Sequence, residues 1–228
     1  NGWPMPIGAC QPQPVRLALP PPMRANKLSG NPRMYEVFGT IASRTFRVLW
    51  ALEELGEPYE LIAVKPHDPT LTAVYPAGKV PALRVDGQII SDSTAIMTYL
   101  ADKHGALLAT AGSVERGQQD AMVHAIIDEI DAVLWAGARH SFILPENRRV
   151  PAVKDSLKWE FNRNVNRLAE RITTPFAAGE TFTIADIILT HCLNWSISAK
   201  FDYDSEKMQA YAKQMRARPA FQRARALG

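Results

Sequence analysis

Two short segments carry residues suited to holding a ligand. In the first, Pro81 follows Val80 at the head of a predicted strand, where it donates no hydrogen bond and tolerates a cis peptide bond. In the second, Asp92 and Ser93 open a predicted helix, whose free N–H groups and positive dipole end attract a carboxylate. Together the two segments predict a site for a small peptide-like molecule.

Each segment also has a purely structural interpretation. A proline at a strand start needs no ligand, and polar residues at a helix start commonly serve as N-caps. We expect Asp92 and Ser93 to act both as caps and as ligand-binding residues. Lys79, beside the same site, either pairs with a carboxylate of the ligand or is solvated.

A third segment, residues 39–47, places hydroxyl groups in a turn between a predicted strand and a predicted helix. Ser43 is the first candidate donor and Thr40 the second, while Arg44 adds positive charge. A hydroxyl group near a helix N-terminus can donate to an anion and stabilise it. The structural alternative is that Ser43 is only the N-cap of this helix.

The elements that position these segments follow from hydrophobic periodicity and turn signals. Within the first half the hydrophobic pattern changes from that of a strand to that of a helix and back. Asp86-Gly87 is a strong two-residue hairpin signal. The order is β-α-β followed by β-β-α, which is the thioredoxin-like plan. The predicted strands are 34–39, 58–64, 81–85 and 88–91, and the predicted helices are 43–56 and 92–105.

The second half has long amphipathic helical patterns and almost no strand signal, so an all-helical domain is expected. Its predicted helices are 114–140, 151–172, 183–197 and 206–218, and the basic stretch after 213 is read as a helix-ending segment. The predicted division is a proline-rich N-terminal extension over 1–33, a thioredoxin-like domain over 34–105 and an all-helical domain over 114–228.

Composition excludes several classes of protein. The chain has 228 residues, 46% hydrophobic and 21% charged, with a net charge of +3 and interspersed signs, so neither nucleic acid nor a membrane is an expected partner. Two cysteines, Cys10 and Cys192, make no disulfide framework and fit a reducing cytoplasmic compartment. Cys192 is expected to be a small buried hydrophobe. The histidine spacing predicts no metal site.

Three motifs, Gly-Lys-Val-Pro-Ala-Leu, Ser-Asp-Ser-Thr-Ala-Ile and Thr-Ile-Ala-Asp-Ile, occur in this order from Met34 onward. Their order and spacing resemble the cytosolic glutathione transferases of bacterial type. The resemblance implies a cis bond before Pro81, with the Val80 backbone pairing to the cysteinyl unit of glutathione. It also implies that Asp92 and Ser93 bind the γ-glutamyl unit, and that Lys79 suits the glycine carboxylate.

The resemblance also implies a reaction. Glutathione as co-substrate is activated as a thiolate by Ser43, whose spacing to Arg47 resembles the serine-type theta class, and the thiolate attacks a small hydrophobic electrophile or a peroxide. Thr40 is the second candidate for this role and Tyr35 the third. The absence of cysteine from the turn disfavours thiol-disulfide chemistry. The alternative is a non-catalytic binding or scaffold protein of the same fold.

Further expectations concern the helical half. The family builds its electrophile pocket there, which makes Met122, His124, Trp135 and Arg139 candidate lining residues, and family members acting in detoxification are typically homodimers. Thr183 and Asp186 form a predicted capping box, a structural feature rather than part of the site.

Overall fold

The computed structural model describes residues 35–228, all within one compact unit. The extension predicted for residues 1–33 lies outside the described residues.

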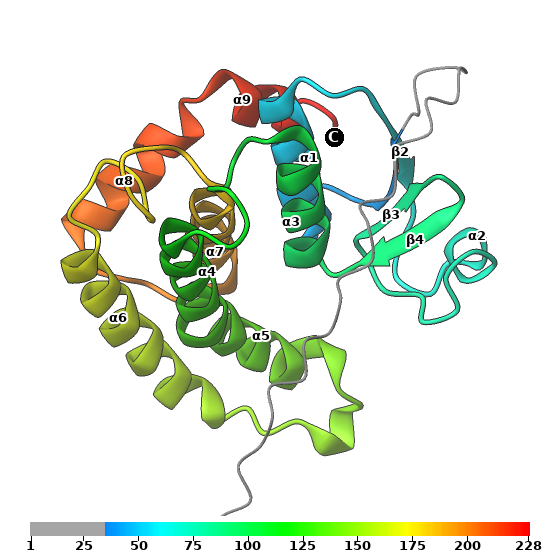
Figure 1. Ribbon diagram of the computed structural model, residues 1–228. Helices are drawn as coiled ribbons and strands as arrows, with labels where there is room; N and C mark the ends of the chain where they lie inside the picture. The colour runs from blue at the N-terminus through cyan, green and yellow to red at the C-terminus, as the bar shows by residue number, and fades with distance from the viewer. Residues whose placement is uncertain (1–34) are drawn as a thin grey trace, which may run out of the picture. The chain divides into compact units, whose positions relative to one another are not determined.

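A four-stranded mixed sheet opens the described chain. Its strands are β1 (Tyr35–Gly39), β2 (Tyr59–Ala63), β3 (Ala82–Val85) and β4 (Gln88–Ser91), in the spatial order β2-β1-β3-β4 (Figure 1). β1 and β2 are parallel, and the other pairs are antiparallel, as the β-α-β and hairpin signals predict. Asp86 and Gly87 have φ values of 52° and 74°, which an Asp-Gly hairpin turn requires.

Helices cover both faces of this sheet. α1 (Thr45–Leu55) and α3 (Ser93–His104) pack on one face, where Val37 and Leu83 are fully buried. The short helix α2 (Pro69–Thr72) packs on the other face, where Leu71 joins Phe38 and Ala82. Alternate side chains of β1 therefore enter different clusters, as the strand period of two requires. α2 falls in the polar segment for which the sequence predicted no element.

The remaining described chain is helical, which confirms a thioredoxin-like sheet followed by a helical region (Figure 1). Its α-helices are α4 (Val114–Ile126), α5 (Ala132–Ala138), α6 (Val153–Arg171), α7 (Ile184–Ala199), α8 (Glu206–Arg216) and α9 (Pro219–Arg225). α7 packs against α1, α3, α4 and α5, so it joins the two halves. The assignment of 34–105 and 114–228 as separate domains stays a prediction.

Two expectations about the helical region are incomplete. The helix expected over 114–140 is helical throughout, but it contains one π-helical turn, η1 (Ile127–Asp131), and continues through a second, η2 (Arg139–Ile143). The C-terminal segment is not merely a helix ending. Pro219 starts α9 at its first turn, where a missing N–H group costs nothing. A short 3₁₀ turn, η3 (Glu146–Arg148), precedes α6.

The capping box at the start of α7 is confirmed. The Thr183 side chain accepts from the helix backbone, and the Asp186 carboxylate accepts from the Thr183 N–H group at 2.7 Å. Asp186 also accepts from Ala177 N at 2.7 Å and from the Tyr211 hydroxyl at 2.6 Å. This carboxylate therefore anchors two further segments besides its own helix.

Candidate active site

The register of the sheet brings the three predicted segments to one edge. Phe38 of β1 pairs with Ala82 of β3, and Ala82 pairs with Ser91 of β4. The turn with Thr40 follows Phe38, the pair Val80–Pro81 precedes Ala82, and Asp92–Ser93 follows Ser91. The three segments lie up to about 50 residues apart in sequence, and all of them adjoin the same end of three adjacent strands.

The peptide bond between Val80 and Pro81 is cis, in agreement with the expectation from the family resemblance. Val80 is half-buried, and Lys79 before it is exposed. Among the described residues, Lys79 forms no ion pair, so its charge is available to a ligand.

Asp92 is a helix cap in an unusual backbone conformation. Its φ of 71° is uncommon for a residue with a side chain, and such conformations persist where the surrounding structure enforces them. One carboxylate oxygen, Oδ1, accepts from Thr94 N at 2.8 Å and from Ala95 N at 3.2 Å. The side chain is exposed, and within the described chain Oδ2 accepts no hydrogen bond.

Ser93 is 2% exposed, and its Oγ accepts a long hydrogen bond of 3.4 Å from Arg47 Nη1. The predicted capping role therefore belongs to Asp92, while Ser93 contacts the interior of the protein.

The Ser43 hydroxyl is engaged inside its own turn. Its Oγ donates to Thr40 O or to Thr45 Oγ1, both at 2.8 Å, and accepts from Thr45 N at 3.2 Å. Ser43 thus bonds to the first N–H group of α1, but the N-cap residue is Arg44, whose side chain makes no capping bond. The Thr40 hydroxyl makes no hydrogen bond to another described residue, so it is the less committed of the two candidate donors.

Arg44 is held by neighbouring side chains, although it also lines the cavity beside α3. Its Nε and Nη2 donate to the Asp131 carboxylate at 3.1 and 2.5 Å, and its guanidinium lies 5.0 Å from the ring centres of both Trp135 and Trp195. The two-point bond to Asp131 fixes this guanidinium group, and a part for Arg44 in glutathione binding stays a prediction. Its positive charge still lies next to Ser43.

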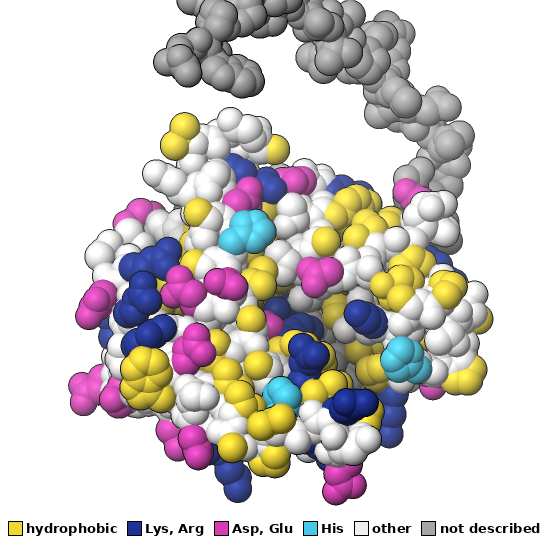
Figure 2. Space-filling model, turned by 90° about the horizontal axis from the view of Figure 1, so that it is seen from below, with side chains coloured by type: hydrophobic (Ala, Val, Ile, Leu, Met, Phe, Trp, Pro, Cys, Tyr) yellow, Lys and Arg dark blue, Asp and Glu magenta, His cyan; other side chains and the backbone are white. Residues whose placement is uncertain are grey.

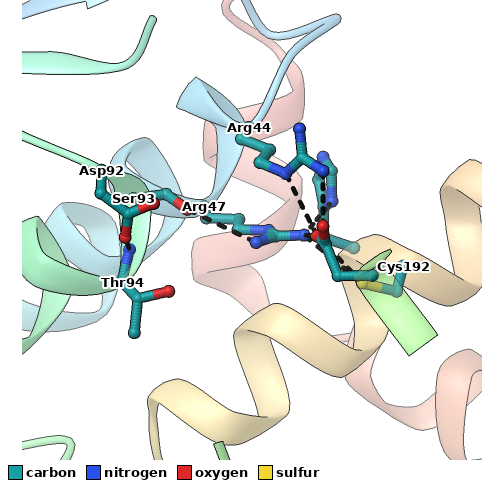
Figure 3. Close-up of polar contacts among 8 residues, drawn as sticks. Arg44, Arg47, Asp92, Ser93, Thr94 and Cys192 are labelled. Carbon is teal, nitrogen blue, oxygen red and sulfur yellow. Dashed lines mark hydrogen bonds and ion pairs between the residues drawn. The ribbon is translucent and has the colours of Figure 1, made fainter. Parts of the chain in front are cut away.

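Arg47 is the centre of a buried polar cluster that the sequence analysis did not recognise. The side chain is 2% exposed and donates to Asp131, with Nη2 also 3.2 Å from His191 Nδ1 and 3.4 Å from Cys192 Sγ (Figure 3). Its Nε is buried without a hydrogen-bond partner in the described chain. Cys192 is buried as expected, but it contacts charged groups rather than only apolar ones.

The sequence does contain a signal for Asp131. With Ile127, Ile130 and Leu134 it follows the i, i+3, i+4, i+7 spacing of one helix face. A carboxylate on an apolar stripe must be buried and therefore paired. Arg47, on the apolar stripe of α1, is its natural partner.

The charge states in this cluster follow from its burial. Burial raises the pKa of Asp131, but the guanidinium groups of Arg47 and Arg44 outweigh it and hold the pKa well below its usual range. Burial, with Arg47 nearby, holds the pKa of His191 well below its usual value. Burial raises the pKa of Cys192 to about 12. At neutral pH the histidine and the thiol are therefore uncharged.

A cavity of about 750 Å³ lies beside this cluster, between α3 and α4. Its walls include Asp92, Ser93, Arg47, Asp131 and His124. In the space-filling view, a hollow near the middle of the face carries Lys and Arg side chains among hydrophobic ones (Figure 2). Such a surface suits a ligand with both anionic and apolar parts.

The structure separates the four candidate pocket residues. Of these, only His124 lines the cavity. Trp135, 38% exposed, stacks on Arg44, and Met122 is half-buried against the core. Arg139 is exposed at the start of η2.

Tyr35 lies at the far end of β1 from the turn. Its hydroxyl is 2.8 Å from His104 Nε2, and Lys103 Nζ lies 4.7 Å from its ring centre. Gly39 is four positions further along the strand, a distance of about 13 Å. This position places Tyr35 away from the other candidate donors.

No helix in residues 35–228 is long and apolar enough to cross a membrane. No group of three or more His, Cys, Asp or Glu side chains there could hold a metal ion.

Known proteins match both the sequence and the fold. The family model "Glutathione S-transferase, N-terminal domain" matches residues 43–103, which include Ser43, the cis bond and the start of α3. Glutathione S-transferase F13 of Arabidopsis thaliana is 27% identical over 77% of this chain and 87% of its own length. Glutathione S-transferase GstA of Escherichia coli O157:H7 is 29% identical over 75% of this chain and 87% of its own length.

In sequence, the chain is therefore similar to the glutathione S-transferases. Among solved structures, the theta class glutathione S-transferase of Xanthomonas axonopodis pv. citri, with glutathione bound, aligns with a TM-score of 0.72. It is 24% identical and covers 84% of this chain and 97% of its own, which supports the shared fold. The relatives named glutathione S-transferases are enzymes.

Proposed function

We propose that this chain is a glutathione transferase whose glutathione lies across the sheet edge formed by the β1–α1 turn, Val80–Pro81 and Asp92–Ser93. The observation that carries the proposal is the register row of Phe38, Ala82 and Ser91, which brings the three segments together. Two strand spacings of about 4.8 Å span roughly 10 Å. Three extended residues also span about 10 Å, so a tripeptide reaches from one outer segment to the other.

Each part of glutathione has a chemically matched group along this row. The γ-glutamyl carboxylate suits the free N–H groups at the start of α3 and the Ser93 hydroxyl. The free carboxylate oxygen of Asp92 can accept from the γ-glutamyl ammonium. The cysteinyl unit pairs with the Val80 backbone as an added strand, and the glycine carboxylate pairs with Lys79.

The thiol end then lies at the β1–α1 turn. A free thiol has a pKa of about 8.5, and lowering it by about two units requires roughly 2.7 kcal/mol of preferential thiolate stabilisation. Ser43 supplies part of this if its O–H group turns from Thr40 O or Thr45 Oγ1 toward the sulfur. Thr40 is the competing donor because its hydroxyl is uncommitted.

The reaction needs no further cofactor in this scheme. The thiol releases its proton to solvent, the thiolate forms a bond to an electrophilic carbon, and the leaving group departs with the bonding electrons. With a peroxide, the sulfur bonds to one oxygen as the O–O bond breaks, and the alkoxide that leaves takes a proton from solvent. A second glutathione then reduces the resulting sulfenic acid, giving glutathione disulfide and water. Catalysis comes from thiolate activation and from holding both reactants together. A cytoplasmic homodimer remains part of the proposal.

The test is a titration of bound glutathione followed by the ultraviolet absorbance of its thiolate. We expect Ser43→Ala to raise the thiol pKa by about one unit or more and to slow conjugation, and Thr40→Val to leave both near the wild-type values. Ser156→Ala, a change of the same type in α6, is the control. The reverse pattern would assign activation to Thr40.

A thiol pKa that neither variant changes would remove both hydroxyls from catalysis. If wild-type protein binds glutathione with an ordinary thiol pKa and conjugates no electrophile, the binding or scaffold alternative holds instead.

A further inference from the structure

The buried cluster under the β1–α1 turn joins four elements. Arg44 and Arg47 come from the start of α1, Asp131 from η1, and His191 and Cys192 from α7. Arg47 also reaches Ser93 at the start of α3 (Figure 3). The cluster therefore contacts one end of the proposed glutathione row directly.

It contacts the other end as well. Arg44 is the residue after Ser43, and the His191 ring lies close enough to the Ser43 backbone for that backbone to raise the pKa of the ring. Ser43 and Ser93, at opposite ends of the row, are thus both bonded to or adjacent to this one cluster. A ligand lying between the two serines lies against its surface.

The cluster carries an uncompensated charge. Two guanidinium groups share one carboxylate, and His191 and Cys192 are neutral. Three further carboxylates line the adjoining cavity: exposed Asp92 caps its own helix, and Asp102 and Asp120 both pair with Arg116, outside the cluster. Arg44, Arg47 and Asp131 are the charged members of the cluster itself. One net positive charge is left next to the turn, where reduced solvent screening strengthens its interaction with an anion.

We propose that this net charge, supplied by Arg47 and Arg44 and set by Asp131, stabilises the glutathione thiolate from beneath the turn. The inference rests on the proposed function. It makes Arg44, Arg47 and Asp131 positioning residues that act on the sulfur through space and through the turn, with Ser43 as the group in contact with it. Asp131 has two opposite effects, because it anchors the arginines and also cancels half of their charge.

A structural role and an electrostatic role of the cluster predict opposite changes in the thiol pKa when Asp131 is replaced. If the cluster only holds the turn in place, loss of either an arginine or Asp131 disorders the turn and raises the thiol pKa. If its charge acts on the sulfur, loss of an arginine raises the thiol pKa, whereas loss of Asp131 lowers it.

The first experiment uses Arg44, whose partial exposure makes its replacement tolerable. The thiol pKa of bound glutathione is measured by thiolate absorbance in the full chain. We expect Arg44→Gln to raise it by about one unit, a tenfold loss of thiolate at a fixed pH below the pKa, and Arg44→Lys to restore most of the difference.

The second experiment compares Asp131→Asn with Asp128→Asn, the same change at an exposed position of the same turn. We expect Asp131→Asn to lower the urea midpoint of unfolding and yet to lower the thiol pKa by about one unit, while Asp128→Asn leaves the thiol pKa unchanged. If Asp131→Asn does not fold, Arg44→Lys decides the question, because lysine keeps the charge but not the two-point bond to Asp131. A purely structural cluster then predicts a raised thiol pKa in Arg44→Lys as well.

Two outcomes would overturn the inference. One is a thiol pKa that rises in both Arg44→Gln and Asp131→Asn, and the other is a thiol pKa that neither Arg44→Gln nor Asp131→Asn changes. Both presuppose that wild-type protein binds glutathione with a lowered thiol pKa. If it does not, the proposed function itself has failed.

Discussion

Two buried carboxylates show how differently single residues are accommodated in this molecule. Asp131 is ionised because two guanidinium groups face it, and their charges hold its pKa below the usual range despite burial. Asp186 faces neutral donors, and burial raises its pKa although four hydrogen bonds oppose the rise. The arrangement at Asp131 leaves a positive charge beside the proposed site. The arrangement at Asp186 only holds neighbouring segments in contact.

Replacing Asp186 therefore tests a purely structural role. Asp186→Ala leaves the N–H groups of Ala177 and Thr183 and the Tyr211 hydroxyl without their acceptor, so we expect a loss of about 3 kcal/mol in the free energy of unfolding. Denaturant unfolding measures it, with Asp155→Ala, at an exposed position in the first turn of α6, as control. The interpretation fails if the two variants are equally stable.

His191 predicts how stability depends on pH. Its pKa is lowered in the folded state, so below about pH 6.5 the unfolded chain binds a proton that the folded chain does not. Stability is then lost as the pH falls, by about 1 kcal/mol between pH 6.5 and 5.5. Asp131, whose pKa is also lowered, adds a further loss below about pH 4.

The measurement is urea unfolding at several pH values. His191→Asn should remove the slope between pH 6.5 and 5.5, whereas His67→Asn should not. His67 is exposed and has a φ of 64°, which asparagine also adopts, so it is a matched control. An unchanged slope in His191→Asn would contradict the account.

At the scale of helices and strands, sequence patterns predicted the sheet and most helices because strand alternation, Asp86-Gly87 and the Gly56 stop are local signals. Gly56 indeed ends α1 with a φ of 70°. The π turn at Ile127–Asp131 was not predictable in this way, because its extra residue is set by packing against α6 and α7. α9 was missed because its seven residues are too few to show a period.

Replacing two helix glycines by alanine should change the free energy of unfolding in opposite directions. A Cβ atom on Gly137 would lie 2.6 Å from Cζ of the buried Phe201, so Gly137→Ala should destabilise the protein by about 1–3 kcal/mol. A Cβ atom on Gly117 meets nothing within 4 Å, so Gly117→Ala should stabilise it by about 1 kcal/mol. Thermal and denaturant unfolding would check both, and equal signs would contradict the packing at Phe201.

α9 should be essential for the stability of α1. Phe221 contacts the rings of Phe46 and Trp50 with centroid distances of 5.2 and 5.0 Å, and Arg218 donates to Glu54 at 2.6 and 2.8 Å. We expect Phe221→Ala to cost about 3 kcal/mol or more in unfolding free energy. Arg225→Ala, an exposed change in the same helix, should cost less than about 1 kcal/mol. A near-neutral Phe221→Ala would show that α9 contributes little.

At the scale of the whole molecule, the proposed site exists because three strands end at one edge and one polar cluster holds that edge to the helices. The motifs Val80–Pro81 and Asp92–Ser93 were predictable from sequence because each has its own local chemistry. The Ser43 hydroxyl bonds within its own turn, where the sequence left a binding role and a capping role open. The two-point bond of Arg44 was not predictable, since it depends on a partner far along the chain. Asp131, the partner of Arg44, lies 87 residues from it in the sequence.

The central claim is that this edge binds one glutathione per chain. Calorimetric titration of the purified full chain with reduced glutathione tests it most directly. We predict saturable binding near one site per chain, lost in Ser93→Ala combined with Asp92→Ala and kept in Asp155→Ala. Absence of binding at millimolar glutathione in the folded wild-type protein would contradict the account and leave the family's fold without its ligand.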